Sequence, residues 1–181
     1  MKQFLLARVC SVEEFPDVSS TGFSPRDNQL QCGGDCDKKH RLCAWLLLQK
    51  LLSEAGFDEQ SAELRLLPCG KWTGKDVFVS LSHCDGFVAA AVSSRSVGID
   101  VEPTSRLVSP QLYNRIATDN ERALYGQTPS NQTLLGLWTA KEAAFKASDG
   151  KVSATKIDTT LFDVSTDSKN GVVCSVATPK A

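Results

Sequence analysis

Val97-Gly98-Ile99-Asp100-Val101-Glu102 is the stretch of sequence on which the fold depends. Its β-branched residues favour a buried strand over 97–101. Because side chains alternate along a strand, Asp100 and Glu102 point the same way. Two adjacent carboxylates repel each other unless a cation lies between them, and a hard divalent ion with oxygen ligands meets that need. A sheet edge that carries two solvated acids explains the strand equally well.

A second segment, Trp138-Thr139-Ala140-Lys141-Glu142-Ala143-Ala144-Phe145-Lys146, favours a helix. Glu142 and Lys146 are four residues apart and are therefore neighbours on the helix surface. Taken alone, they are an ordinary ion pair of an exposed helix. Taken with Asp100 and Glu102, they supply three acids and a lysine, which is a suitable set for magnesium-dependent phosphate chemistry.

The remaining pattern predicts an α+β order with mainly antiparallel pairing. The predicted helices cover 37–55, 110–116, 120–125 and 133–148. The predicted strands cover 64–67, 77–82, 87–92, 97–101, 159–164 and 171–176. Asp37 is the predicted N-cap of the first helix, Thr118 to Glu121 fits a capping box, and Asn170-Gly171 favours a hairpin turn.

Bulk properties give few constraints on partners. The chain has 181 residues and a net charge of −1, so nothing in its overall charge indicates nucleic acid or a membrane surface. No apolar run reaches the roughly 18 residues that a membrane span needs. The apolar start is short and is followed by Glu13 and Glu14, which is not typical of a signal peptide. We expect a cytoplasmic protein.

The seven cysteines include one cluster, because Cys32, Cys36, His40 and Cys43 fall within twelve residues. Such a group is able to hold zinc, although its spacing is not that of a usual zinc knuckle. A loop that runs into a helix with a few buried thiols is the interpretation we favour, since free thiols are the rule in the cytosol.

The motifs, in their order and spacing, resemble those of the 4′-phosphopantetheinyl transferases, specifically the surfactin-synthetase (Sfp-type) class. The resemblance covers residues 70–150 and rests on Ser82-His83, Gly98 to Glu102, and Trp138 to Lys146. It implies a fold of two similar α+β halves, each a helix packed on a small antiparallel sheet, with the active site between them. We place the boundary near Ser94 to Ser96. Residues 1–95 would then contact the coenzyme A nucleotide, and residues 96–181 would carry the metal site and the catalytic helix.

The resemblance also implies a role for each matched residue. Asp100, Glu102 and Glu142 correspond to the acids that hold Mg²⁺ against the pyrophosphate of coenzyme A. Lys146 would protonate the departing phosphate, and Glu142 would act as base toward the carrier serine. The residues expected to bind coenzyme A are Ser82, His83, Lys71 and Arg41, the last through the 3′-phosphate. The chain also departs from the family: Trp72 replaces a proline, Ile116-Ala117 replaces an aromatic pair, the chain is shorter than most Sfp-type enzymes, and the loop up to Cys36 matches poorly.

The activity implied by the resemblance is transfer of the 4′-phosphopantetheine arm of coenzyme A to a serine of an apo acyl or peptidyl carrier protein. Magnesium is the implied cofactor, 3′,5′-ADP is the leaving product, and a monomer is expected. Carriers of fatty-acid, polyketide, nonribosomal-peptide and siderophore synthesis all remain open. Arg106, Arg115 and Arg122 are candidates for meeting an acidic carrier, or are simply solvated charges. The alternative to an enzyme is a homologue that binds coenzyme A or a carrier without turnover.

Overall fold

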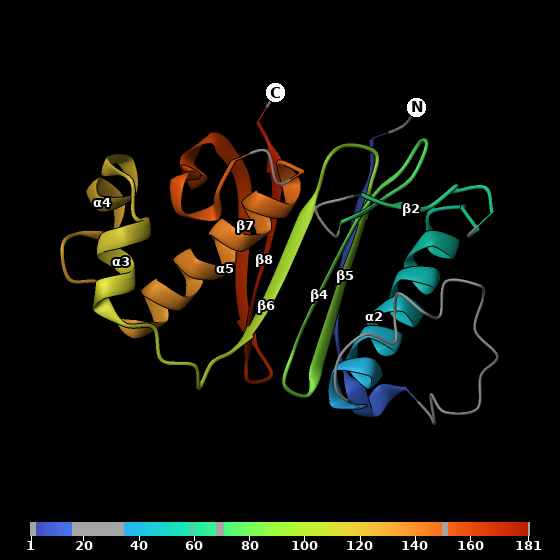
Figure 1. Ribbon diagram of the computed structural model, residues 1–181, viewed down its shortest axis with the longest axis horizontal. Coiled ribbons are helices and arrows are strands. Elements are labelled where there is room, and N and C mark those ends of the chain that lie inside the picture. The colour runs from blue at the N-terminus through green and yellow to red at the C-terminus, as the bar shows by residue number, and fades with distance from the viewer. Residues whose placement is uncertain (1–2, 16–34, 59, 68–70, 150–151, 181) are drawn as a thin grey trace.

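The computed structural model describes residues 3–15, 35–58, 60–67, 71–149 and 152–180, with only the backbone for residues 35–37. Two antiparallel sheets run side by side through the middle of the molecule, and each carries one long helix (Figure 1). The predicted α+β class with two similar halves is therefore confirmed. None of the described helices is long and apolar enough to cross a membrane.

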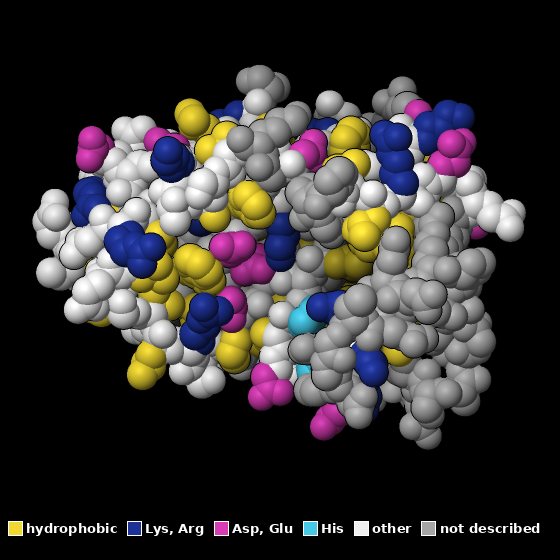
Figure 2. All heavy atoms as spheres, in the orientation of Figure 1, with side chains coloured by type: hydrophobic (Ala, Val, Ile, Leu, Met, Phe, Trp, Pro, Cys, Tyr) yellow, Lys and Arg dark blue, Asp and Glu magenta, His cyan; other side chains and the backbone are white. Residues whose placement is uncertain are grey.

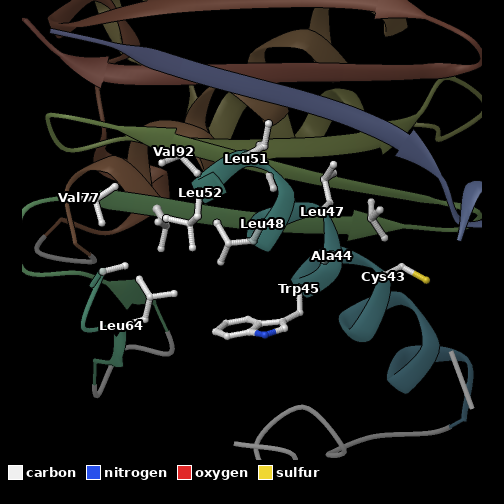
Figure 3. Packing of buried hydrophobic residues seen from close by; sticks show 14 of the residues in the cluster. Cys43, Ala44, Trp45, Leu47, Leu48, Leu51, Leu52, Leu64, Val77 and Val92 are labelled. Carbon is white, nitrogen blue, oxygen red and sulfur yellow. The ribbon is translucent and has the colours of Figure 1, made fainter. Parts of the chain in front are cut away.

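The first sheet has the strand order β1-β5-β4-β3-β2. Its strands are β1 (Leu5–Ser11), β2 (Arg65–Leu66), β3 (Trp72–Thr73), β4 (Phe78–Cys84) and β5 (Phe87–Ser93). Helix α2 (Asp35–Glu54) covers one face of this sheet, and a short 3-10 helix, η1 (Val12–Glu14), follows β1. Figure 3 shows the buried leucines of α2, Leu47, Leu48, Leu51 and Leu52, packed beside Val92 of β5.

The second sheet has the strand order β6-β8-β7. Its strands are β6 (Gly98–Pro103), β7 (Phe162–Lys169) and β8 (Val172–Pro179). Helix α5 (Asn131–Ala147) crosses this sheet, and α3 (Pro110–Ile116) and α4 (Asp119–Tyr125) lie beyond its N-terminal end (Figure 1). Two 3-10 helices, η3 (Ala154–Lys156) and η4 (Thr159–Leu161), lead from α5 into β7. A helix on an antiparallel sheet is thus the plan of both halves.

Serine side chains of β4 join the two halves to each other. The amide of Ile99 donates to Oγ of Ser80 at 3.1 Å, and the amide of Val101 donates to Oγ of Ser82 at 3.4 Å. These bonds satisfy backbone groups of β6 that have no strand partner on that side. The predicted boundary between residues 95 and 96 falls in the link between β5 and β6, and the existence of two separate domains stays a prediction.

Most predicted elements match the structure, and the differences have local causes. Helix α2 begins at Asp35, so the prediction that Asp37 caps it was wrong. The strand predicted over 159–164 begins only at Phe162, because Thr159 donates two hydrogen bonds to Glu121 and is held in η4. The Asn170-Gly171 turn is confirmed: both residues have positive φ, +53° and +82°, as a tight right-twisted hairpin requires.

Candidate active site

Asp100 lies near the centre of the candidate site, in the middle of β6. Its side chain is buried, and its Oδ1 accepts hydrogen bonds from Oγ of Ser82 and Nζ of Lys146, both at 2.8 Å. Its other oxygen, Oδ2, is also buried and has no hydrogen-bond partner among the described residues. Burying a carboxylate oxygen without a partner costs free energy, so a cation or a hydrogen-bond donor at this oxygen would stabilise the site.

Lys146 reaches Asp100 from the last turn of α5. Its ammonium also donates to the carbonyl of Ile99 at 3.0 Å, so two of its three protons are directed at β6. At the other end of α5, Ser130 caps the helix, because its side chain accepts a hydrogen bond from the amide of Thr133. The ion pair with Asp100 thus fixes the position of the lysine above the strand.

Glu142 lies one helical turn before Lys146 and is half-buried. Burial raises the pKa of its carboxyl, and the nearby charges of Asp100 and Glu102 raise it further, against the opposing effects of Lys146 and Arg106. The three acids are therefore close enough to repel one another. This is the grouping predicted from the two sequence segments.

Glu102 is bound by two residues. The indole Nε1 of Trp138 donates to its Oε1 at 3.3 Å, and the guanidinium of Arg106 forms an ion pair with the same oxygen. Arg106 also lies over the Trp138 ring, 5.5 Å from its centroid. Sequence reasoning missed this cluster, since Arg106 was considered only as a contact for a carrier or as a solvated charge; its position four residues after Glu102 was the available signal.

Acidic side chains gather near the middle of the face shown in Figure 2, with lysine or arginine and histidine side chains close by. Within the described part of the chain, no three His, Cys, Asp or Glu side chains are arranged as ligands of a metal ion. Lys146 and Arg106 instead neutralise two of the acids. The residues nevertheless suit Mg²⁺, which takes a few carboxylate oxygens: Oδ2 of Asp100 has no partner among the described residues, and Glu142 lies close enough to Asp100 and Glu102 to feel their charges.

Comparison with known proteins finds similarity in the part of the chain that holds this site. Residues 96–179, which contain all three acids and the lysine, match the family model of the 4′-phosphopantetheinyl transferase superfamily. Residues 96–179 belong to this superfamily. It is also 31% identical, over 139 residues, to enterobactin synthase component D of Escherichia coli O157:H7 and to the protein of the same name in Shigella flexneri. These alignments cover 74% of this chain but 66% of each relative, just under two thirds of their length.

The coenzyme A residues expected for a phosphopantetheinyl transferase lie in the first half of the chain. His83 is exposed at the end of β4, and its ring lies 5.7 Å from that of His40 on α2. Lys71 is largely buried and pairs with Asp149, just after α5, at 2.7 Å. Arg41 is half-buried on α2. Ser82 is buried and bonded to Asp100, so its position fits orientation of that acid at least as well as contact with a ligand.

Of the four residues considered as a zinc group, only His40 and Cys43 have side chains among the described residues. Cys32 and the side chain of Cys36 lie outside them. Cys43 is fully buried in the core under α2, and Nε2 of His40 accepts a hydrogen bond from the amide of Gly86 at 3.1 Å. Trp72, which departs from the family pattern, packs on Trp45 with 4.8 Å between ring centroids and so belongs to the same core.

A groove of about 610 Å³ lies away from the candidate site, between β1 and the β7–β8 hairpin. Ile99 lines it, and Ile99 points to the opposite side of β6 from Asp100. None of the predicted site residues is among its lining residues. We therefore place the chemistry on the other side of β6, where α5 meets the strand.

Proposed function

We propose that this protein transfers the 4′-phosphopantetheine arm of coenzyme A to a serine of an apo carrier protein. The observation that carries the proposal is the convergence of Asp100, Glu102, Glu142 and Lys146 from two distant segments. The order of the motifs around them also supports assignment to the Sfp-type class.

In the proposed reaction, the serine oxygen of the carrier attacks the β-phosphorus of coenzyme A. A new oxygen–phosphorus bond forms, and the bond from that phosphorus to the bridging oxygen breaks, releasing 3′,5′-ADP. Bound Mg²⁺ would neutralise charge on the pyrophosphate oxygens. Asp100, Glu102 and Glu142 would hold the ion, and charge stabilisation of this kind supplies much of the rate in phosphoryl chemistry.

The proton transfers are assigned to α5. Glu142 would take the serine proton as general base. Lys146 would give a proton to the departing oxygen of 3′,5′-ADP. Its ion pair with Asp100 keeps the ammonium in place until the substrate enters.

Coenzyme A would bind across both halves of the molecule. His83 would contact a phosphate, Lys71 would meet the nucleotide after leaving Asp149, and Arg41 would meet the 3′-phosphate. Ser82 would support this site through its hydrogen bond to Asp100. These four assignments come from the resemblance, and each is testable by the KM for coenzyme A of the corresponding alanine variant.

The carrier would meet the surface formed by the end of β6, α3 and α4. Leu107 and Leu124, in the loop after β6 and in α4, are 86% and 67% exposed, and Arg115 of α3 is also exposed. Exposed leucines and an exposed cation in this segment suit a carrier with an acidic, partly apolar helix. Because the relatives are named as components of enterobactin synthase, we propose a peptidyl carrier as the first substrate to test.

The decisive experiment incubates the protein with coenzyme A, Mg²⁺ and a panel of apo acyl and peptidyl carrier domains, and follows loading by mass. Asp100→Asn, which keeps the size of the side chain, should abolish loading, and Asp167→Ala on the exposed face of β7 should not. An Asp100→Asn variant as active as the parent would remove the metal site from the mechanism.

A non-catalytic homologue is the second candidate. The observation that favours it is the neutralisation of Asp100 and Glu102 by Lys146 and Arg106. That candidate predicts tight binding of coenzyme A or a carrier with no loading under any condition. Binding measured by calorimetry beside the loading assay separates the two.

A further inference from the structure

Gly98 of β6 lies against the backbone of α5. A Cβ added to Gly98 would lie 1.9 Å from the carbonyl oxygen of Ala143 and 2.7 Å from the amide nitrogen of Ala147. Side-chain carbons do not approach heavy atoms closer than about 3.0 Å. Because the opposing atoms are backbone, no side-chain rotation relieves the clash, and any larger residue must move the strand or the helix.

This point of contact lies within the candidate site. Ala143 directly follows Glu142, and Ala147 directly follows Lys146. On β6, Gly98 is two residues before Asp100 and shares its face. The contact is tied at one end by Ser96, whose Oγ donates to the carbonyl of Ala147. The distance between β6 and α5 is therefore fixed at a contact that lies next to Glu142, Lys146 and Asp100, the residues to which we assign the chemistry.

We infer that Gly98 is a positioning residue, which lets α5 approach β6 closely enough for Glu142 and Lys146 to meet Asp100 and Glu102. To accept a methyl group at residue 98, the helix must withdraw by about 1 Å, which is enough to stretch the 2.8 Å contact between Lys146 and Asp100 beyond hydrogen-bonding distance. The expected effect on turnover rests on the proposed function. The expected effects on geometry and on metal binding do not rest on it.

The test compares Gly98→Ala with Gly136→Ala. Gly136 lies on α5, the helix that packs against Gly98, but a Cβ at Gly136 would meet only Cγ2 of Thr166 at 3.7 Å, an ordinary contact. A displacement of about 1 Å costs on the order of 100-fold in rate. We expect Gly98→Ala to lose about that much kcat with a nearly unchanged KM for coenzyme A, and Gly136→Ala to stay close to the parent.

A second readout is independent of turnover. Mn²⁺, a spectroscopic substitute for Mg²⁺, should bind Gly98→Ala at least about tenfold more weakly than Gly136→Ala by paramagnetic resonance, since the three acids no longer converge. If the parent loads no carrier, the proposed function fails, and Mn²⁺ binding still tests Gly98. A folded Gly98→Ala variant with parental kcat or parental Mn²⁺ affinity overturns the inference.

Should Gly98→Ala not fold, Ser96→Ala tests the same contact without adding volume. It removes the bond that ties Ala147 to the segment preceding β6, and we expect a reduced kcat and weaker Mn²⁺ binding with an unchanged KM for coenzyme A. Parental values of kcat and Mn²⁺ affinity in Ser96→Ala would overturn the inference.

Discussion

The ammonium of Lys146 lies 2.8 Å from Oδ1 of Asp100, although 46 positions separate the two residues in the sequence. Only the packing of α5 on β6 brings them together. The pair joins the acid that we assign to the metal and the amine that we assign to the leaving group. The ion pair therefore holds the proposed metal ligand and the proposed proton donor next to each other.

Lys146→Ala should lower transfer by about 10²- to 10⁴-fold, the usual effect of removing a positioned acid. The fold should survive, because Ser82 still donates to Asp100. Initial rates of carrier loading test this, with circular dichroism as the check of folding. The control is Lys156→Ala, an exposed lysine of η3. Equal rates for the two variants would exclude Lys146 from the chemistry.

Arg106→Gln should strengthen binding of the metal by a few-fold. In the structure Arg106 neutralises Glu102, so an incoming cation must displace the guanidinium. The pair is partly exposed and is therefore worth no more than about 1 kcal/mol. Mn²⁺ titrations of Arg106→Gln and of the exposed-surface control Arg115→Gln measure the effect. A weaker affinity in Arg106→Gln would mean that the arginine supports the site instead of competing for it.

Glu121→Gln should destabilise the protein strongly. Glu121 and Lys141 are 0% and 1% exposed and form an ion pair at 2.8 Å. Removing one partner of a buried pair leaves an uncompensated charge and costs about 3–5 kcal/mol. Urea unfolding measures the loss, and Asp119→Asn, at an exposed position on the same helix, is the control. A loss below about 1 kcal/mol would show that water reaches Lys141.

The same residue predicts a dependence of stability on pH. Burial alone would raise the pKa of Glu121, but hydrogen bonds from Lys141, Thr118 and Thr159 outweigh it and lower the pKa below the ordinary value of 4.5. The stabilisation is therefore complete above pH 4.5 and is lost as the pH falls through the lowered folded-state pKa. The parent should lose free energy of unfolding over this acid range, and the Glu121→Gln variant should lack that component.

Leu124→Asp should raise the KM for the carrier protein without changing the KM for coenzyme A. Leu124 is exposed on α4, and a new negative charge there would repel an acidic carrier as well as remove apolar contact. The expected rise is about tenfold or more, and it should shrink at high salt. The control is Leu161→Asp, a leucine 64% exposed on η4, before β7. Equal effects of both variants on the KM for the carrier would show that the carrier does not bind at α4.

Several features were predictable because they depend on neighbours in the sequence. Alternation along 97–102 put Asp100 and Glu102 on one face, and spacing along α5 did the same for Glu142 and Lys146. The capping box from Thr118 to Glu121 and the Asn170-Gly171 turn are equally local, and both are present. These patterns follow from the geometry of a single strand, helix or turn.

The partners of the site residues were not predictable in this way. Ser82 donates to Asp100, Arg106 covers Glu102, Glu121 pairs with Lys141, and Lys71 pairs with Asp149. Most of these contacts join elements that are far apart in the chain. Thr159 illustrates the consequence: its two bonds to Glu121 turned the start of a predicted strand into a 3-10 helix.

The sequence alone determined which side chains were available for the chemistry and which face of its own element each one occupies, because the periods of helix and strand are built into the backbone. The tertiary structure decided how close those faces come. That distance depends on the fit of Gly98 against the backbone of α5, a contact between two chain segments that no local pattern encodes.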